Sequence, residues 1–228
     1  MNVRGVLGSS VVQAIAIEVP VYLPDIINAL AKRYGFVTLP TTAAEFFPPE
    51  NTPIVLSHGK YIHEGRTLLI RSVKLYNRAV IVETAGSTED SEGVLHDGLE
   101  CVASTIGQTE KGIAAPGTNR LYTSQLEIGL DLPFGNYFPM LQGVSEAVTH
   151  SLQQYGLTYP PMQVHSLSMN VDPGKTALIC NFRIERRVGF AYELEIYFTE
   201  APLKTSDHIA ALEAFERAMK DAAMRLAS

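Results

Sequence analysis

The sequence predicts an α+β fold of two tandem β-α-β-β-β-α units that form antiparallel sheet with helices packed on one face. Two helical segments, "YLPDIINALAKRYG" and "YFPMLQGVSEAVTHSLQQYG", share an aromatic-apolar-proline start and a Tyr-Gly end. Three strand-like segments and then a further helix follow each of them. One duplication explains these matches, whereas unrelated halves would require coincidences. We therefore predict a first unit over residues 1–107, a linker over 108–120 and a second unit over 121–228.

The first unit is expected to begin with a strand over Val11–Val19 and a helix over Pro24–Tyr34. Proline suits the first helical position, and Gly35 suits the position just after the helix. The helix has an apolar face made of Leu23, Ile26, Ile27 and Leu30. Strand patterns then occur in "PIVLSHGKYI", "TLLIRSVKLY" and "AVIVET".

The last helix of the first unit is expected to start after Ser87, which is a suitable N-cap with Asp90 as its capping-box partner. Gly107 suits the end of this helix. Its apolar face is Leu95, Leu99, Val102 and Ile106, and a polar stripe beside it is Glu89, Glu92, His96 and Glu100. Dinuclear metal sites in helical bundles use Glu-x-x-His steps on two helices, a pattern that this chain lacks. We therefore expect a solvated helix face and no metal site.

The second unit repeats this order after the polar, Gly- and Pro-containing linker. It begins with a strand in "LYTSQLEIGLDL" and a helix over about Pro139–Tyr155. The expected core face of that helix is Phe138, Leu141, Val144, Val148, Leu152 and Tyr155. Strands in "MQVHSLSMNV", "TALICNFRIERRV" and "AYELEIYFTE" and a final helix over Asp207–Leu226 complete the unit.

This element order resembles the duplicated fold of the TATA-box-binding protein and, less closely, the helix-grip folds. The resemblance implies an antiparallel sheet that curves around helices on one face. The second half and the segment "STEDSEGVLHDGLE" are also similar to uncharacterised, sporadically distributed prokaryotic proteins, which implies no activity. Function must therefore be inferred from sites.

The best candidates for catalysis lie in "SHGKYIHEG", which contains His58, His63 and Glu64. On a regular strand His58 and Glu64 share one face and His63 lies on the other, so one ion cannot readily use both histidines. A surface hairpin explains all three, and the alternative is a pocket in which His63 acts as general base, with His165 as a further candidate. The chain has no phosphate loop, no nicotinamide fingerprint and no Cys/His metal spacing, so we expect no cofactor.

The densest basic run is "NFRIERRVG", in which Arg183, Glu185 and Arg187 share one strand face. Glu193, Glu195 and Tyr197 share a face of the next strand, so we expect arginine–glutamate pairs across the strands. The net charge of −6 and the pI of about 5.5 also disfavour nucleic-acid binding.

A long Pro-rich loop, Leu39–Pro53, contains Phe46 and Phe47. These rings either cap the core or present a binding anchor to a partner. The leading hypothesis is a non-catalytic binding or assembly subunit that engages another protein, or a second copy, through the sheet face and this loop. The alternatives are a small-molecule sensor or enzyme with a pocket between sheet and helices, and, third, a nucleic-acid-binding protein.

We expect a cytoplasmic protein that does not interact with membranes. The sequence shows no signal-peptide pattern and no apolar run of about 18 residues. Cys101 and Cys180 both occur among apolar residues, and two cysteines in 228 residues do not suggest a disulfide framework.

Overall fold

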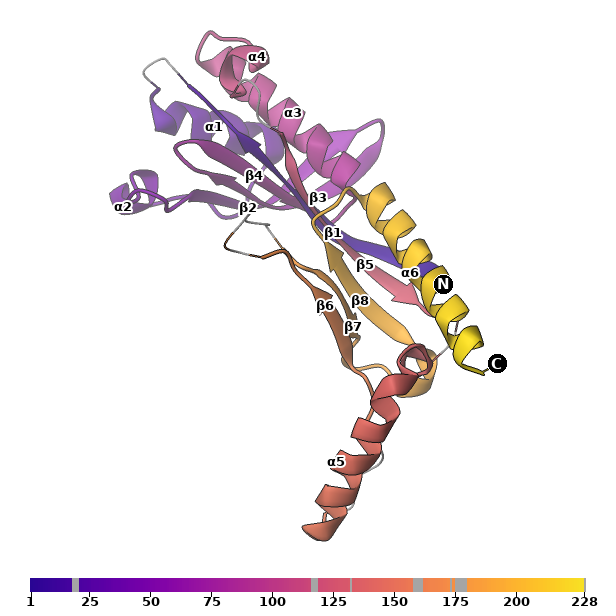
Figure 1. Cartoon of the computed structure of the whole chain (residues 1–228). Coiled ribbons are helices and arrows are strands. Elements are labelled where there is room, and N and C mark those ends of the chain that lie inside the picture. Colours follow the sequence, from indigo (N-terminus) through magenta and orange to yellow (C-terminus); the bar gives the residue numbers. More distant parts are fainter. Residues whose placement is uncertain are drawn as a thin grey trace.

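A computed structural model describes residues 1–17, 21–115, 119–131, 133–157, 162–172, 174 and 180–227. Within these residues the fold is α+β, with one eight-stranded antiparallel sheet in the order β2-β3-β4-β1-β5-β8-β7-β6 (Figure 1). The strands are β1 Asn2–Ala14, β2 Ile54–His63, β3 Arg66–Leu75, β4 Ala79–Thr84, β5 Leu121–Gly129, β6 Ser166–Met169, β7 Phe182–Arg186 and β8 Ile196–Ala201. The helices are α1 Leu23–Tyr34, α2 Ala43–Phe46, α3 Thr88–Thr105, α4 Glu110–Ile113, α5 Gln142–Gln154 and α6 Thr205–Ala227, with 3₁₀ turns η1 Phe134–Tyr137, η2 Pro139–Leu141 and η3 Tyr192–Leu194.

Each half of the sheet has the same internal strand order. In the first half β1 pairs with β4, β4 with β3 and β3 with β2, and in the second half β5 pairs with β8, β8 with β7 and β7 with β6. The halves join where β1 runs antiparallel to β5, with Ser9 opposite Ser124. The N-termini of α3 and α6 meet above this junction: the Thr88 amide donates to Thr205 Oγ1 (2.9 Å) and the Thr205 amide donates to Thr88 Oγ1 (2.8 Å).

The helices α1, α3 and α6 lie on one face of the sheet, and each half has its own apolar core beneath them. In the first half α1 is held against α3 by a polar contact, because Arg33 and Tyr34 both donate to the Asp97 carboxylate (3.0 and 2.6 Å to Oδ2). These bonds outweigh the opposing effect of burial and hold the pKa of Asp97 below its usual range.

The capping predictions for the first half are confirmed. Ser87 accepts a hydrogen bond from the Asp90 amide while the Asp90 side chain accepts one from the Ser87 amide. Gly35 and Gly107 have left-handed backbone at φ 60° and 69°, which glycine adopts at little cost. Helix α1 starts one residue before the expected Pro24.

Several predicted boundaries were wrong. The first strand starts at Asn2 rather than Val11, because β5 pairs along nearly the whole of β1 and stabilises a segment whose glycines disfavour a strand. Gly8 is needed there, since a Cβ would lie 2.8 Å from the Thr84 carbonyl oxygen. The predicted strands in "MQVHSLSMNV" and "TALICNFRIERRV" shorten to β6 and β7, and residues 176–179 of the latter lie outside the described residues.

The segment predicted as a linker, residues 108–120, contains α4. Ile113 of α4 is buried in the first core, and Ala114 forms a bridge with Ile15. Residues 116–118 of the segment lie outside the described residues.

The predicted core face of the second helix was confirmed only at Phe138, which packs against the second core, and was wrong for the residues on α5. Helix α5 projects away from the sheet (Figure 1), and none of its residues is buried. Gly98 lies ten residues after Thr88 and Tyr34 packs against it, whereas Phe215 lies ten residues after Thr205. The second core is covered by η1 and α6, where the Phe215 ring packs on Tyr137.

Candidate ligand pocket

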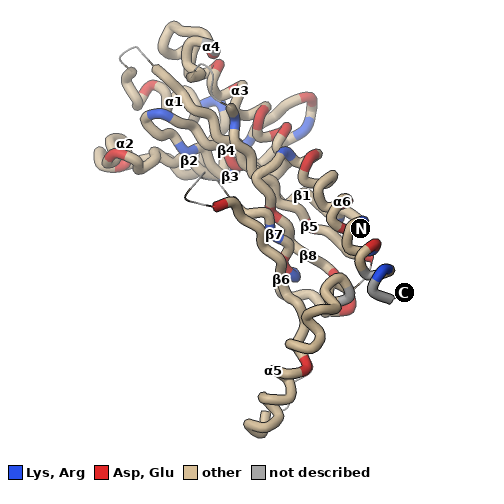
Figure 2. The backbone as a smooth tube through the Cα atoms, viewed as in Figure 1, with Lys and Arg blue, Asp and Glu red and all other residues tan. Residues whose placement is uncertain are grey.

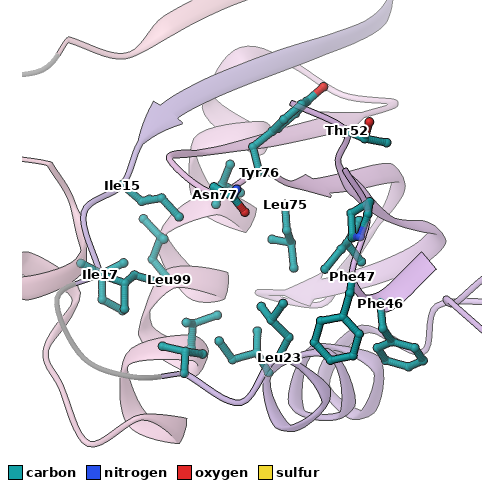
Figure 3. Close-up of a pocket in the computed structure, with 17 residues that line it drawn as sticks. Ile15, Ile17, Leu23, Phe46, Phe47, Thr52, Leu75, Tyr76, Asn77 and Leu99 are labelled. Carbon is teal, nitrogen blue, oxygen red and sulfur yellow. The ribbon is translucent and has the colours of Figure 1, made fainter. Parts of the chain in front are cut away.

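An apolar pocket of about 440 Å³ lies in the first half, between the sheet and the helices (Figure 3). Its walls come from Ile15 and Ile54 of the sheet region, Leu23 and Ile26 of α1, Leu99 of α3 and Ile113 of α4. We call this cavity the ligand pocket. Its volume lies within the ~300–1,000 Å³ range of small-molecule sites, and its mainly apolar lining is typical of them.

The polar side chains of the ligand pocket gather along one side. Thr52, Tyr76 and Asn77 lie opposite Leu23 (Figure 3). Tyr76 and Asn77 also line a neighbouring hollow of about 560 Å³, whose other residues include Glu50 and Arg78. Among the residues that the structure describes, Glu50 and Arg78 form no ion pair. The apolar pocket therefore adjoins a polar hollow that offers both a cation and an anion.

The loop at Leu39–Pro53 forms one wall of the ligand pocket. Helix α2 is fixed by a capping box in which the Glu45 amide donates to Thr42 Oγ1 and the Glu45 carboxylate accepts from the Thr42 amide (3.0 Å). Backbone hydrogen bonds from Thr41 and Thr42 lower the pKa of Glu45. The base of the loop is attached to the sheet by the bridge between Thr38 and Ser57.

The loop presents Phe46 and Phe47 to the pocket. Both rings line the cavity in Figure 3. Phe46 is half-buried and packs against the first core, whereas Phe47 is 64% exposed. The sequence left open whether these rings cap the core or remain available to a partner. In the structure Phe46 covers the core, and Phe47 remains accessible at the edge of the pocket.

The histidines and glutamate proposed for catalysis lie elsewhere. His58 has left-handed backbone (φ 59°) within β2, and Glu64 lies in the β2–β3 turn (φ 48°). His63 is exposed and stacks on Tyr61, with its Nε2 atom 3.8 Å from Glu64. His165 lies in the second half, 3.8 Å from Glu185. The structure brings none of these side chains into the ligand pocket.

The polar stripe on α3 is only partly solvated. His96 accompanies Glu100 and Glu110 in an exposed cluster whose ligand atoms lie within 4.8 Å of one another. Glu110 was missed in the sequence because it lies in the linker, which folds back so that its carboxylate is 2.7 Å from His96 Nδ1. A hydrogen bond or ion pair between His96 and Glu110 accounts for this contact.

Glu92 contradicts the expectation of a solvated stripe. Its side chain is only 21% exposed and contacts Arg120 (3.2 Å), Tyr122 (2.5 Å) and Lys204 (3.1 Å). Burial alone would raise the pKa of Glu92, but the hydrogen bonds from Tyr122, Lys204 and Arg120 hold it below its usual range. The sequence could not show this, because the partners lie in distant segments.

The sheet face away from the helices carries paired charges. Arg183 pairs with Glu200 (3.2 Å), Arg187 with Glu127 (3.2 Å) and Lys74 with Glu83 (2.6 Å). The predicted arginine–glutamate pairing is thus confirmed, but the predicted partners were wrong. Strand β8 starts at Ile196, so Glu193 lies in η3, and Glu195 pairs instead with the buried Arg186 (3.1 Å).

A buried polar cluster lies at the junction of the halves and was not predicted. Ser9 Oγ is 2.7 Å from Ser91 Oγ, and Ser124 Oγ is 2.7 Å from His208 Nδ1. Both members of the Ser124–His208 pair are fully buried, and within the described part of the chain His208 Nε2 has no hydrogen-bond partner. Burial lowers the pKa of His208 to about 4. Neither Ser124 nor His208 is among the residues that line the ligand pocket.

No protein-family model matches the chain, and a search of curated proteins finds no match either. Within the described residues no helix is both long enough and apolar enough to span a bilayer. The ligand pocket must therefore be interpreted from its own geometry.

Proposed function

We propose that the chain is a non-catalytic binding protein that holds an apolar small molecule with a polar end in the ligand pocket. The observation that carries this proposal is the apolar cavity that adjoins a polar hollow at Tyr76 and Asn77. An apolar tail would occupy the cavity, and its polar end would lie near Arg78 and Glu50. Among the described residues that line the cavity there is no His, Cys, Asp, Glu or Lys, and its side-chain hydroxyls are those of Thr52 and Tyr76, so the lining has no imidazole, carboxylate, amine or thiol for catalysis.

Assembly with another protein through Phe46 and Phe47 is the second candidate. It is favoured by the exposure of the Phe47 ring at the edge of the pocket. Small-molecule binding ranks first because both rings line a cavity, whereas a protein anchor needs only an exposed ring.

We further propose that the two halves arose by duplication of one unit. The shared strand order, the Ser9–Ser124 register and the reciprocal Thr88–Thr205 bonds support this proposal. The topological resemblance to the TATA-box-binding fold stays a prediction. Nucleic-acid binding ranks last, since Arg183 and Arg187 of the open sheet face are engaged by glutamates rather than available to phosphates.

Filling the ligand pocket should abolish binding of a suitable probe. A dansyl-labelled fatty acid is expected to bind the wild type saturably, with blue-shifted emission. The variant Leu23→Trp places a larger ring in the cavity and should weaken binding about tenfold or more, because a packed site has no room for both. The matched control Leu69→Trp changes a leucine that is 46% exposed on a strand and should bind like the wild type. Equal binding by Leu23→Trp would contradict the proposal.

The variant Phe47→Ala removes the exposed ring and should weaken binding of the dansyl-labelled fatty acid without destabilising the fold. Loss of ~40–80 Å² of apolar contact at ~25 cal/mol per Å² corresponds to roughly a 5- to 30-fold loss of probe affinity. The melting temperature should change little because the ring is largely exposed. The control Phe190→Ala removes an exposed phenylalanine of the second half. A large loss of melting temperature with intact probe binding would assign Phe47 to the core instead.

A further inference from the structure

A second, smaller cavity adjoins the ligand pocket in the first half of the molecule. Its volume is about 20 Å³, and four residues line both cavities: Leu75, Val80, Leu99 and Val102. We call the small space the inner cavity and these four residues the partition. Figure 2 shows Lys, Arg, Asp and Glu in both halves of the molecule, but none of them is among the described residues that line the inner cavity.

The lining of the inner cavity favours apolar atoms over water. A space of this size can hold about one water molecule, but a buried water needs two to four polar partners. Among the described lining residues Tyr34 supplies the one polar side chain, and its hydroxyl already donates to Asp97 Oδ2 (2.6 Å). The inner cavity therefore suits the end of an apolar chain.

The polar hollow lies at the turn of the β3–β4 hairpin. Asn77 and Arg78 are the two residues of this turn, which is closed by a hydrogen bond from the Tyr76 amide to the Ala79 carbonyl oxygen (2.8 Å). Two residues are the usual length of a tight connection between antiparallel strands. The hairpin thus fixes where the polar end of the site lies.

The inner cavity lies farther along the same hairpin. The cross-strand pair Leu75–Val80 lines both cavities, and Val73–Val82, two residues farther from the turn, lines the inner cavity alone. Two strand residues span about 6.5 Å. The order from the turn is therefore polar hollow, ligand pocket and inner cavity.

The two helices above the hairpin give the same order. On α1, Ile26 lines the ligand pocket and Leu30 lines the inner cavity. On α3, Leu99 lines both cavities and Leu95 lines the inner cavity alone. Each of these steps is four residues, or about 6 Å of helix. Two strands and two helices thus agree that the inner cavity continues the ligand pocket in the direction away from the polar hollow.

We propose that the ligand is a linear amphiphile, such as an unbranched fatty acid, and that the partition limits the length of its chain. This inference rests on the binding function proposed above and adds the class of ligand and the direction in which its chain lies. The head group occupies the polar hollow, and the last carbons of the chain reach Leu99. A compact ring system fits this site less well, because the polar hollow, the pocket and the inner cavity follow one another along one direction.

Leu99 is the partition residue best placed to set the limit. It is 3% exposed and belongs to α3, whereas Leu75, the other leucine of the partition, is half-buried. Truncation of Leu99 to alanine removes three carbon atoms between the ligand pocket and the inner cavity, so the two spaces should join. The joined space should accept a chain that is longer by about two to four carbons, because a packed interior has no other room for them.

Isothermal titration calorimetry with a series of saturated fatty acids that differ by one carbon tests this proposal. The affinity of the wild type should rise about fourfold with each added methylene, because each one buries further apolar surface, and should stop rising at one chain length. Leu99→Ala should move this break to chains that are about two to four carbons longer. Leu99→Val, a smaller change, should move it in the same direction by about one carbon, and it keeps the test valid if Leu99→Ala does not fold.

The matched control is Leu56→Ala. It removes the same three carbon atoms from a fully buried leucine of the first half that lines neither cavity, so the break should stay where the wild type has it. A wild-type affinity that rises without a break, a break that both Leu99 variants leave in place, or an equal shift in Leu56→Ala would overturn the proposal. Absence of binding of every acid would contradict the proposed function as well, whereas binding that Leu23→Trp weakens but that shows no break contradicts this inference alone.

Discussion

At the scale of single residues, His208 is the buried group with the clearest consequence for stability. It is fully buried, contacts Ser124 and the Phe182 ring, and has a pKa lowered to about 4 by burial. The unfolded chain binds this proton near pH 6.5. The unfolded state therefore binds more protons between these values, and the free energy of unfolding should fall as pH decreases through this window.

We predict that protonation linked to His208 alone lowers the free energy of unfolding by about 3 kcal/mol as the pH falls from 7 to 4. The measurement is urea unfolding of the wild type and His208→Gln across this range. The variant keeps an acceptor for the Ser124 hydroxyl but cannot titrate, so its stability should vary less with pH by about that amount. Identical pH profiles for the two proteins would show that His208 is not the responsible group.

The sequence predicted residue-level features that depend on near neighbours. The Ser87–Asp90 capping box and the left-handed Gly35 and Gly107 follow from a few consecutive residues, and these predictions were confirmed. The Ser124–His208 pair was missed because its members lie 84 residues apart and carry no local pattern. For the same reason, no spacing rule could show the contacts of Glu92 with Tyr122 and Lys204.

At the scale of elements, Glu92 connects three parts of the fold. Its carboxylate links α3 to Tyr122 of β5 and to Lys204 just before α6. We predict that Glu92→Ala lowers the free energy of unfolding by about 1–3 kcal/mol, because the partners lose a charged acceptor in a half-buried place.

The control for Glu92 is its exposed neighbour on the same stripe. Glu100→Ala should change stability by no more than about 0.5 kcal/mol, as is usual for exposed positions. Chemical denaturation of the three proteins gives both values. Equal stability of Glu92→Ala and Glu100→Ala would restore the simpler view that the whole stripe is solvated.

Helix α5 marks the limit of prediction for elements. Its periodicity predicted an apolar helix, and a helix formed over Gln142–Gln154. The pattern alone cannot say what covers an apolar face, and here η1 and α6, with Phe215 on Tyr137, pack on the second core instead.

At the scale of the whole molecule, the α+β class and the order of elements were predictable because each strand and helix has its own local pattern. The ligand pocket was not. Its walls come from α1, α3, α4, the sheet and the Phe46–Phe47 loop, and each contributes ordinary apolar residues that serve equally well in a solid core. Only their arrangement in space leaves a cavity.

The most direct test of the central claim is a crystal structure of the wild type grown with a medium-chain fatty acid. We predict electron density for the acyl chain of the fatty acid between Leu23, Leu99 and Ile54. The carboxylate of the fatty acid should lie near Asn77 and Arg78. Density confined to the groove between α5 and Met162–Val164, or to the open sheet face, with the ligand pocket collapsed or filled by protein side chains, would contradict the account.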